Sequence, residues 1–354
     1  MTRKICITAV DGNTGFAIAE LLLQHREFSR KIDSVVGLAL DPESEQSQEL
    51  KSLGATIVPH TVGRVKTMVK TLKDTGADTI CLVPPAHQDK LDICMELVEA
   101  AKKAQVGNVC LISSAGCDYA DSKKQPRLRE FIDLEALVLE SKGDASIPTG
   151  GSPCVIRYKT RYGGRFYAEN ILLYAPQAKE EGVLPLPIGE SHKFAPIALG
   201  VGVLQLSERF FLANFTQDVA HVAAHVLTGK GKHGFDDRHR GQMMIVTGPK
   251  LCAGDELATA ASKALGTEIK FENISQAEAK RVLKAQSDSD QSELQYLLEY
   301  YSLVREGKTN YIATTAFHDV TGTHPTEPDG FFRLYQNEMR PSKKAKHYHN
   351  QNHK

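Results

Sequence analysis

The chain has 354 residues, of which 41% are hydrophobic and 24% charged, and its 43 basic side chains balance 43 acidic ones. This length fits one large domain with an appendage, or two domains. Balanced charge predicts no direct binding to nucleic acid or to an anionic membrane. No apolar run has transmembrane length and no signal peptide precedes the first one, so we expect a cytoplasmic protein. The seven cysteines lack zinc-type spacing, so we expect no metal.

The amino-terminal segment has the pattern of a buried strand, a glycine turn and a helix. Residues 5–10 form a short apolar run interrupted only by Thr8, Gly12 and Gly15 follow, and a helical apolar pattern begins at Phe16. Such a turn exposes main-chain N–H groups and a helix N-terminus, which together bind the pyrophosphate of a dinucleotide. A plain strand-to-helix turn is the alternative. Counted from Gly12, the third position of Gly-x-x-Gly-x-x-Gly is Ile18, so the pattern is incomplete.

Strands and helices alternate through the first 160 residues. The predicted strands are continuously apolar, as expected when helices cover both faces of a parallel sheet. We therefore predict an α/β fold with a doubly wound parallel sheet, a Rossmann fold. The expected strands are 5–10, 34–40, 56–58, 79–83, 108–112 and 153–157, and the expected helices are 16–23, 46–53, 65–73, 89–104 and 127–141.

Beyond residue 160 the pattern loosens and predicts a smaller α/β lobe on the substrate side. Its expected helices are 166–179, 219–227, 254–265, 275–285 and 293–306, with strands at 243–246 and 268–272. The predicted division is 1–158 for an NAD(P)-binding domain, 159–340 for the substrate-side lobe, and 341–354 for a disordered basic tail. Residues 201–217 form an apolar, aromatic insertion without clean periodicity, and whether this insertion is native stays open.

Short motifs spread along the chain carry a family resemblance. They are Gly12-Asn13-Thr14-Gly15, Cys110-Leu111-Ile112-Ser113-Ser114, Phe166-Tyr167-Ala168-Glu169-Asn170, Asp218-Val219-Ala220 and Val320-Thr321-Gly322-Thr323-His324-Pro325. In this order and spacing, from about residue 4 to 335, they resemble the NmrA-like family of atypical short-chain dehydrogenases/reductases, in particular its fungal-type members. The resemblance implies a Rossmann domain that binds NAD or NADP. It also implies either a reductase of small molecules or a nucleotide-sensing regulator without catalysis, since fold alone does not fix function.

The residues expected to hold the cofactor lie at three strand ends. An acidic side chain at the end of the second strand accepts hydrogen bonds from a ribose 2′-hydroxyl and repels a 2′-phosphate. Asp41 meets this description, but it also fits a turn before Pro42, and Arg30, Lys31 or Arg64 are alternative partners for NADP. NAD and NADP therefore both stay open. The full predicted set is Gly12, Asn13, Thr14, Gly15, Phe16, Asp41, Val83 and Pro84.

Candidate catalytic groups follow the fifth predicted strand. Ser113 and Ser114 end this strand, where related dehydrogenases place a serine that polarises the substrate carbonyl; capping of the strand end is the alternative. Classical relatives use Tyr-x-x-x-Lys on the next helix, where lysine lowers the tyrosine pKa. Here Tyr119 and Lys123 have that spacing but lie in a polar loop. At the helix position where the resemblance implies lysine, the chain has Phe131.

Two further groups complete the predicted site. Tyr167 and Asn170 follow the sixth strand and are candidates for a polar substrate pocket, with an exposed loop as the alternative. His221 and His225 have metal-pair spacing but no adjacent glutamate, which favours an ordinary helix face. The leading hypothesis is an NAD(P)H-dependent oxidoreductase of a small metabolite, such as one of secondary metabolism. The alternative is an NAD(P)-sensing regulator that acts through a protein partner, and a homodimer is open in both cases.

Overall fold

A seven-stranded parallel sheet forms the centre of the molecule. The computed structural model describes residues 2–143, 151–158, 168–198, 218–231, 234–286 and 290–341. The strand order β3-β2-β1-β4-β5-β6-β8, parallel throughout, confirms the predicted Rossmann fold. The strands are β1 (Arg3–Thr8), β2 (Ile32–Ala39), β3 (Thr56–Pro59), β4 (Thr79–Leu82), β5 (Asn108–Ser114), β6 (Ser152–Tyr158) and β8 (Met243–Val246).

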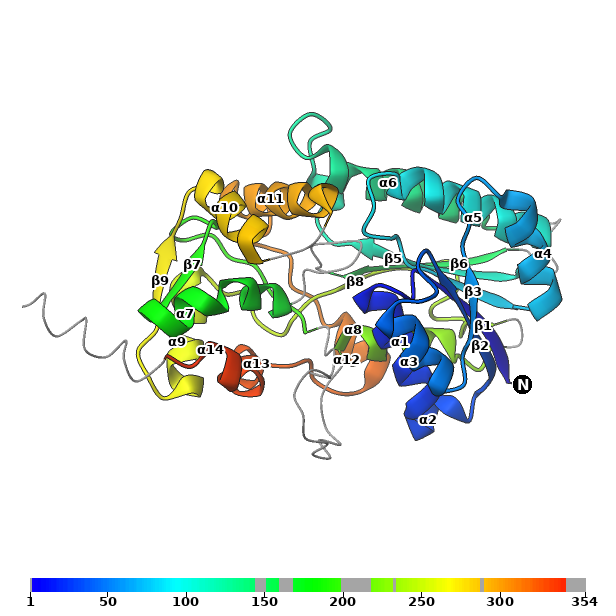
Figure 1. Ribbon diagram of the computed structural model, residues 1–354, viewed down its shortest axis with the longest axis horizontal. Coiled ribbons are helices and arrows are strands. Elements are labelled where there is room, and N and C mark those ends of the chain that lie inside the picture. Colours follow the sequence, from blue (N-terminus) through cyan, green and yellow to red (C-terminus); the bar gives the residue numbers. More distant parts are fainter. Residues whose placement is uncertain are drawn as a thin grey trace, which may run out of the picture.

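Helices cover both faces of this sheet (Figure 1). Neighbouring strand residues supply opposite faces: Val35 packs into the apolar core on one side of β2 and Val36 into the core on the other. This explains why the strands are continuously apolar. One face is covered by α4 (Val65–Thr75), α5 (Lys90–Ala104) and α6 (Pro126–Leu139). The other is covered by α1 (Asn13–Gln24), α2 (Arg26–Ser29), α3 (Glu45–Ser52), α8 (Asp218–Leu227) and α12 (Ala316–Thr321).

The chain changes direction across the sheet between β1 and β4. From β1 it moves outward through β2 to β3, and it then returns to β4 on the other side of β1. At such a reversal the connections leave the two carboxyl ends in opposite directions, which opens a crevice at the sheet edge. The turns after β1, β2, β4 and β5 all border that edge.

A smaller lobe lies at one end of the sheet, beside α6 (Figure 1). Its two short parallel strands are β7 (Val183–Leu186) and β9 (Lys270–Asn273). Helix α11 reaches the carboxyl end of β5, because Tyr296 contacts Ser114. The lobe's helical elements are η2 (Ala168–Tyr174), α7 (Ala175–Glu181), α9 (Gly254–Leu265), α10 (Gln276–Gln286), α11 (Gln291–Arg305), α13 (Pro328–Leu334) and α14 (Gln336–Met339).

Two details differ from the sequence-based division. Strand β8 pairs with β6 and α8 packs on α1, so residues after 159 return to the large sheet before the chain enters the rest of the lobe. The expected helix 166–179 is split within its described part into η2 and α7, because Pro176 starts a new helix. The predicted tail, the 201–217 insertion and Tyr167 lie outside the described residues. Across the described ranges, no helix is long and apolar enough to cross a membrane.

Candidate functional site

The turn after β1 has the geometry of a dinucleotide-binding loop. Ala9 directly follows the strand with a positive φ of 49°, and its carbonyl accepts a hydrogen bond from the Gly12 N–H at 3.1 Å. A Cβ on Gly15 would lie 2.3 Å from the Ala9 oxygen, so only glycine lets α1 pack this closely against the strand end. Among the described residues, a Cβ on Gly12 would contact only that oxygen, at 3.4 Å. Gly12 therefore has an open side that Gly15 lacks.

These contacts correct the position at which the glycine pattern is broken. In dinucleotide-binding turns the first glycine makes the tight turn, the second lets the backbone approach the pyrophosphate, and the third allows close helix–strand packing. Ala9, Gly12 and Gly15 occupy these three positions in order. The departure is thus Ala9 at the first position, not Ile18 at the third.

The first turn of α1 has neither a side-chain cap at Gly12 nor an acidic residue of its own. The initial N–H groups of a helix have no acceptor within the helix and attract anions. Asn13 is partly exposed and Thr14 is buried, whereas Phe16 packs into the core and donates its N–H to the Gly12 carbonyl at 2.9 Å. Phe16 therefore anchors the helix start.

The end of β4 is tied to β1 beside this turn. The Thr8 hydroxyl donates to the Val83 carbonyl and accepts from the Val83 N–H, both at 2.8 Å. Val83 and Pro84 are both buried at the carboxyl ends of β4 and β1. Val83 and Pro84 therefore line the bottom of the crevice, and the Val83 N–H and carbonyl are both hydrogen-bonded to Thr8.

The turn after β2 carries the predicted cofactor residue Asp41, and it contacts Asp11, a residue of the β1 turn that was not among the predicted site residues. The Asp41 N–H donates to Asp11 Oδ2 at 2.8 Å, and Asp41 Oδ1 accepts from the Glu43 N–H at 3.0 Å. Asp11 comes from the β1 turn, so its carboxylate holds the backbone of the β2 turn at this edge. Asp41 also acts as a turn residue, because its backbone carbonyl accepts a hydrogen bond from the Ser47 hydroxyl at 3.0 Å.

Ser113 belongs to a buried ionic cluster at the ends of β5 and β6. Its hydroxyl donates to Glu135 Oε1 at 2.5 Å, and the Arg157 guanidinium binds both oxygens of Glu135, at 2.8 and 2.6 Å. Arg157 also reaches Asp118 at 3.2 Å. Burial raises the pKa of the adjacent Cys117 thiol, which disfavours its reactive thiolate. The Ser113 hydroxyl thus points into α6 and holds a carboxylate.

Ser114 makes a different contact, with the smaller lobe. Tyr296 on α11 donates its hydroxyl to Ser114 Oγ at 2.7 Å, and both side chains are buried. The Tyr296 ring lies 5.7 Å from the Phe131 ring, centroid to centroid. A serine and a tyrosine are therefore hydrogen-bonded at the end of β5, although the tyrosine comes from an element that the sequence analysis did not connect with the site.

A buried lysine lies beside Phe131. Lys90, from α5, places Nζ 4.2 Å from the Phe131 ring centroid and 3.1 Å from Glu130 Oε2, and it donates to the Arg127 carbonyl at 3.0 Å. Burial lowers the pKa of Lys90, and the Glu130 carboxylate opposes this effect. An ammonium group thus lies next to the position where the resemblance implies one, but it is supplied by another helix.

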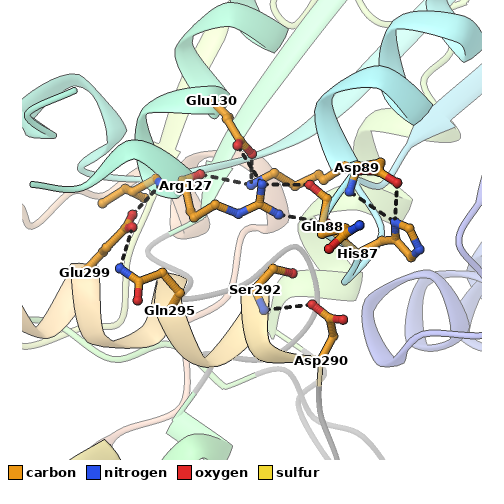
Figure 2. Close-up of polar contacts among 11 residues, drawn as sticks. His87, Gln88, Asp89, Arg127, Glu130, Asp290, Ser292, Gln295 and Glu299 are labelled. Atoms are coloured by element: carbon orange, nitrogen blue, oxygen red, sulfur yellow. Dashed lines mark hydrogen bonds and ion pairs between the residues drawn. The ribbon is translucent and has the colours of Figure 1, made fainter. Parts of the chain in front are cut away.

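A network of polar contacts joins the loop after β4, α6 and α11 (Figure 2). Arg127 donates to the carbonyls of Gln88 at 2.7 Å and His87 at 2.9 Å, and it pairs with Glu130 at 2.8 Å. From α11, Glu299 accepts the N–H of Leu128 at 2.9 Å. These contacts fix the start of α6, and with it the surroundings of Phe131.

Tyr119 and Lys123 do not form a pair in the described part of the chain. Tyr119 lies in η1 (Cys117–Tyr119) with 51% of its surface exposed. The Lys123 N–H donates to Asp121 Oδ1 at 2.8 Å, and Lys123 is exposed. No hydrogen bond joins the two side chains among the described residues, so their helical spacing is not used as in a Tyr-x-x-x-Lys helix.

The remaining candidates lie in the second half of the chain. Asn170 is buried in η2, and its side-chain Nδ2 has no hydrogen-bond partner among the described residues. The rings of His221 and His225 contact Phe28, and His221 also contacts His25. Within the ranges that the structure describes, no three His, Cys, Asp or Glu side chains are grouped as metal ligands.

Comparisons with known proteins agree with this architecture. No family model matches the chain. The NAD(P)H azoreductase of Xenophilus azovorans is 25% identical over 276 residues, 77% of this chain and 79% of the relative. The prestalk A differentiation protein A of Dictyostelium discoideum is 31% identical over 116 residues, 33% of this chain and 36% of the relative.

Solved structures resemble nearly the whole chain. The NADPH complex of a quinone oxidoreductase from Escherichia coli has a TM-score of 0.69 at 20% identity, covering 93% of this chain and 98% of the other. The NADP(H) complex of triphenylmethane reductase from Citrobacter has a TM-score of 0.69 at 15% identity, covering 94% and 99%. A nucleoside-diphosphate-sugar epimerase from Staphylococcus aureus has a TM-score of 0.67 at 18% identity, covering 94% and 100%. At these identities the similarity establishes the fold.

Proposed function

We propose that this protein is an NAD(P)H-dependent reductase of a small organic acceptor, of the NmrA-like type of atypical short-chain dehydrogenase/reductase. One observation carries the proposal. Among the described residues there is space beside Gly12 but none beside Gly15, and Gly12 directly precedes a helix N-terminus that has no side-chain cap. The two relatives solved with NADPH and NADP(H) share this fold over more than nine-tenths of the chain.

The residues present fit such a coenzyme. The main-chain N–H groups at the start of α1 would hold the pyrophosphate, and a side chain at Gly12 would obstruct it. Val83 and Pro84 would border the coenzyme at the end of β4. A reduced nicotinamide supplies a hydride when it is bound. The chain's own contribution is then to position the acceptor and to deliver a proton.

We assign proton delivery to the pair of Tyr296 and Ser114. The acceptor gains a hydride and a proton across its reducible bond, and the proton leaves the Tyr296 hydroxyl, which solvent reprotonates. Ser114 orients that hydroxyl through their 2.7 Å hydrogen bond. Because both side chains are buried, α11 must move away from β5 before an acceptor reaches them. Ser113 is less suited, since its hydroxyl already donates to Glu135.

Quinones and azo compounds are the acceptors to test first. They are the substrate classes named for the quinone oxidoreductase and the azoreductase that resemble this chain. Reduction of either class adds a hydride and a proton, which is the chemistry that a coenzyme and a tyrosine hydroxyl supply together. Triphenylmethane dyes form a third class, because they are named for the triphenylmethane reductase that resembles this chain; their cationic carbon takes up a hydride alone, so this reaction does not need the Tyr296 proton.

The experiment measures coenzyme binding and turnover separately. We expect the purified protein to bind reduced coenzyme and to oxidise it with at least one of these acceptors. Tyr296→Phe should lower kcat roughly 100-fold, a typical contribution of general acid catalysis, and leave the coenzyme Kd unchanged. Tyr300→Phe is the matched control, because this tyrosine is also buried on α11. Tyr119→Phe and Lys123→Met test the predicted loop pair.

A sensor without catalysis is the second candidate, and the surroundings of Phe131 favour it. The α6 position where the resemblance implies lysine is an apolar ring buried against Tyr296, and Ser113 holds an ion pair. Tight coenzyme binding without turnover on any of the three acceptor classes would contradict the reductase proposal and support a regulator that acts through a protein partner.

A further inference from the structure

The carboxyl edge of β2 presents acidic groups where the adenosine half of the coenzyme would lie. In dinucleotide-binding folds an acidic residue here hydrogen-bonds the ribose 2′-hydroxyl, whereas a nearby arginine accommodates a 2′-phosphate. Asp11 and Asp41 are partly exposed and exposed, respectively, and are joined through the Asp41 N–H at 2.8 Å. One carboxylate follows β1 and the other follows β2, so both border the same part of the crevice.

The backbone donors of this turn are already used by carboxylates. The Asp41 N–H donates to Asp11, and the Glu43 N–H donates to Asp41. Exposed turn N–H groups of this kind are common binding groups for phosphate. Here they bind the chain's own anions, and Glu45 adds another acidic residue in the first turn of α3. A 2′-phosphate would therefore meet negative charge without free donors from these two amides.

A buried histidine supplies a second, independent observation at this edge. His60 follows β3 and donates its backbone N–H to the Ala39 carbonyl at 2.7 Å, whereas its ring Nε2 is buried without a hydrogen-bond partner among the described residues. Burial lowers the pKa of His60, while the nearby carboxylates of Glu96 and Asp11 oppose this effect. A neutral imidazole beside Asp11 brings no cation to balance a phosphate.

Two of the basic residues considered as partners for NADP lie far from these carboxylates. Arg30 and Lys31 precede β2, and the Lys31 carbonyl accepts from the Arg3 N–H at 3.0 Å, which places both at the amino end of the sheet. Eight strand residues separate them from the turn, roughly 25 Å. Lys51 lies 3.9 Å from Glu43 and is paired with it. Arg64, the third of the basic residues considered as partners for NADP, is exposed after β3.

We propose that Asp11 and Asp41 form the adenosine-ribose subsite and select a free 2′-hydroxyl, so that this protein uses NADH in preference to NADPH. The inference rests on the proposed function in that a nicotinamide coenzyme binds the crevice. It separates this chain from the two solved relatives, which hold NADPH and NADP(H). Asp11 is the specificity residue that distinguishes the site, because its carboxylate both repels a phosphate and occupies the Asp41 amide.

The test compares the binding of NADH and NADPH to the full chain by calorimetry. ADP-ribose and its 2′-phosphate serve as redox-inert probes of the same subsite. We expect the wild type to bind each unphosphorylated ligand at least roughly 30-fold more tightly than its 2′-phosphate form. Raising the salt concentration should narrow this ratio, since exposed charges are screened.

Isosteric variants test whether the two carboxylates cause the difference in affinity between the unphosphorylated ligands and their 2′-phosphate forms. Asn at either position still accepts the backbone N–H, so Asp11→Asn with Asp41→Asn should keep the fold and bring the ratio within roughly 3-fold. Asp33→Asn is the matched control, an exposed aspartate at the amino end of β2. Arg64→Ala should leave the wild-type ratio unchanged.

Other outcomes are equally decisive. Equal or tighter binding of the 2′-phosphate forms by the wild type would overturn the inference while leaving the reductase proposal intact. A wild-type preference that survives in the double variant would also overturn it, because the selection would then reside elsewhere. A preference for NADH without turnover would uphold the inference and contradict the reductase. Failure to bind all four ligands would overturn both.

Discussion

The two halves of the crevice edge differ in how they are built. At the ends of β1 and β2, Gly12 is open and the acidic side chains of Asp11 and Asp41 reach solvent. At the end of β5, Ser113 and Ser114 are buried and hydrogen-bonded to α6 and α11. The open half needs only local backbone geometry and nearby charge. The closed half depends on groups from elements far apart in the sequence, so its chemistry requires both lobes.

The largest effect is expected in the closed half. Glu135→Leu would leave the Arg157 guanidinium buried without its bidentate partner and Ser113 without its acceptor. Removing one member of a buried ion pair costs about 3–5 kcal/mol of unfolding free energy, and the remaining contact of Arg157 with Asp118 places the expected loss at the lower end of this range. Urea denaturation followed by circular dichroism measures this loss.

The double variant Glu135→Leu/Arg157→Met is the control, because it removes both charges. It should recover most of the lost stability. Additive destabilisation by the two substitutions would show that the ion pair does not act as a unit, and the contrast between the halves would lose its basis.

A matched pair of glycine substitutions tests the open half. Gly15→Ala places a Cβ 2.3 Å from the Ala9 oxygen and should lower the unfolding free energy by about 2–3 kcal/mol. Gly12→Ala meets that oxygen only at 3.4 Å, so its stability should change by less than about 1 kcal/mol. Its coenzyme affinity should fall roughly 10-fold, since the methyl group enters the space expected for pyrophosphate. Denaturation and calorimetry check the two effects, and equal coenzyme affinity in Gly12→Ala would argue against the open half as a binding site.

A smaller effect concerns the pH dependence of stability, through histidines of α8, the helix that packs against α1. Burial, together with charge repulsion from His25 and His225, lowers the pKa of His221 to about 4. The unfolded chain, with an ordinary pKa near 6.5, therefore binds more protons between these values. Stability is unaffected above about pH 6.5, falls as the pH drops, and the loss is complete near pH 4, about 2 kcal/mol after allowance for partial exposure.

His221→Gln should weaken the dependence of the unfolding free energy on pH, and the dependence that remains should come from His225. Unfolding free energies at pH 7 and pH 5 measure it, and the exposed His318→Gln is the control. An unchanged slope in His221→Gln would mean that the ring is not held neutral by burial.

The sequence predicts much of the open half and little of the closed one. Continuous apolar runs indicate the parallel sheet, and a glycine turn before a helix indicates Gly12 and Gly15, because both patterns are local. Asp11 looks like an ordinary turn residue until the fold brings β2 beside β1. Tyr296 lies 182 residues from Ser114 in the chain, and Glu135 has only the pattern of a helix residue. No local spacing connects either of them with its partner.

Hydrogen–deuterium exchange with and without NADH tests most directly that the β1 turn binds a nicotinamide coenzyme. The account predicts slower exchange at the amides of residues 9–16 and 39–43 when NADH is present, with little change in α9 and α10. Protection confined to other segments, or no protection at NADH concentrations that saturate binding, would contradict it.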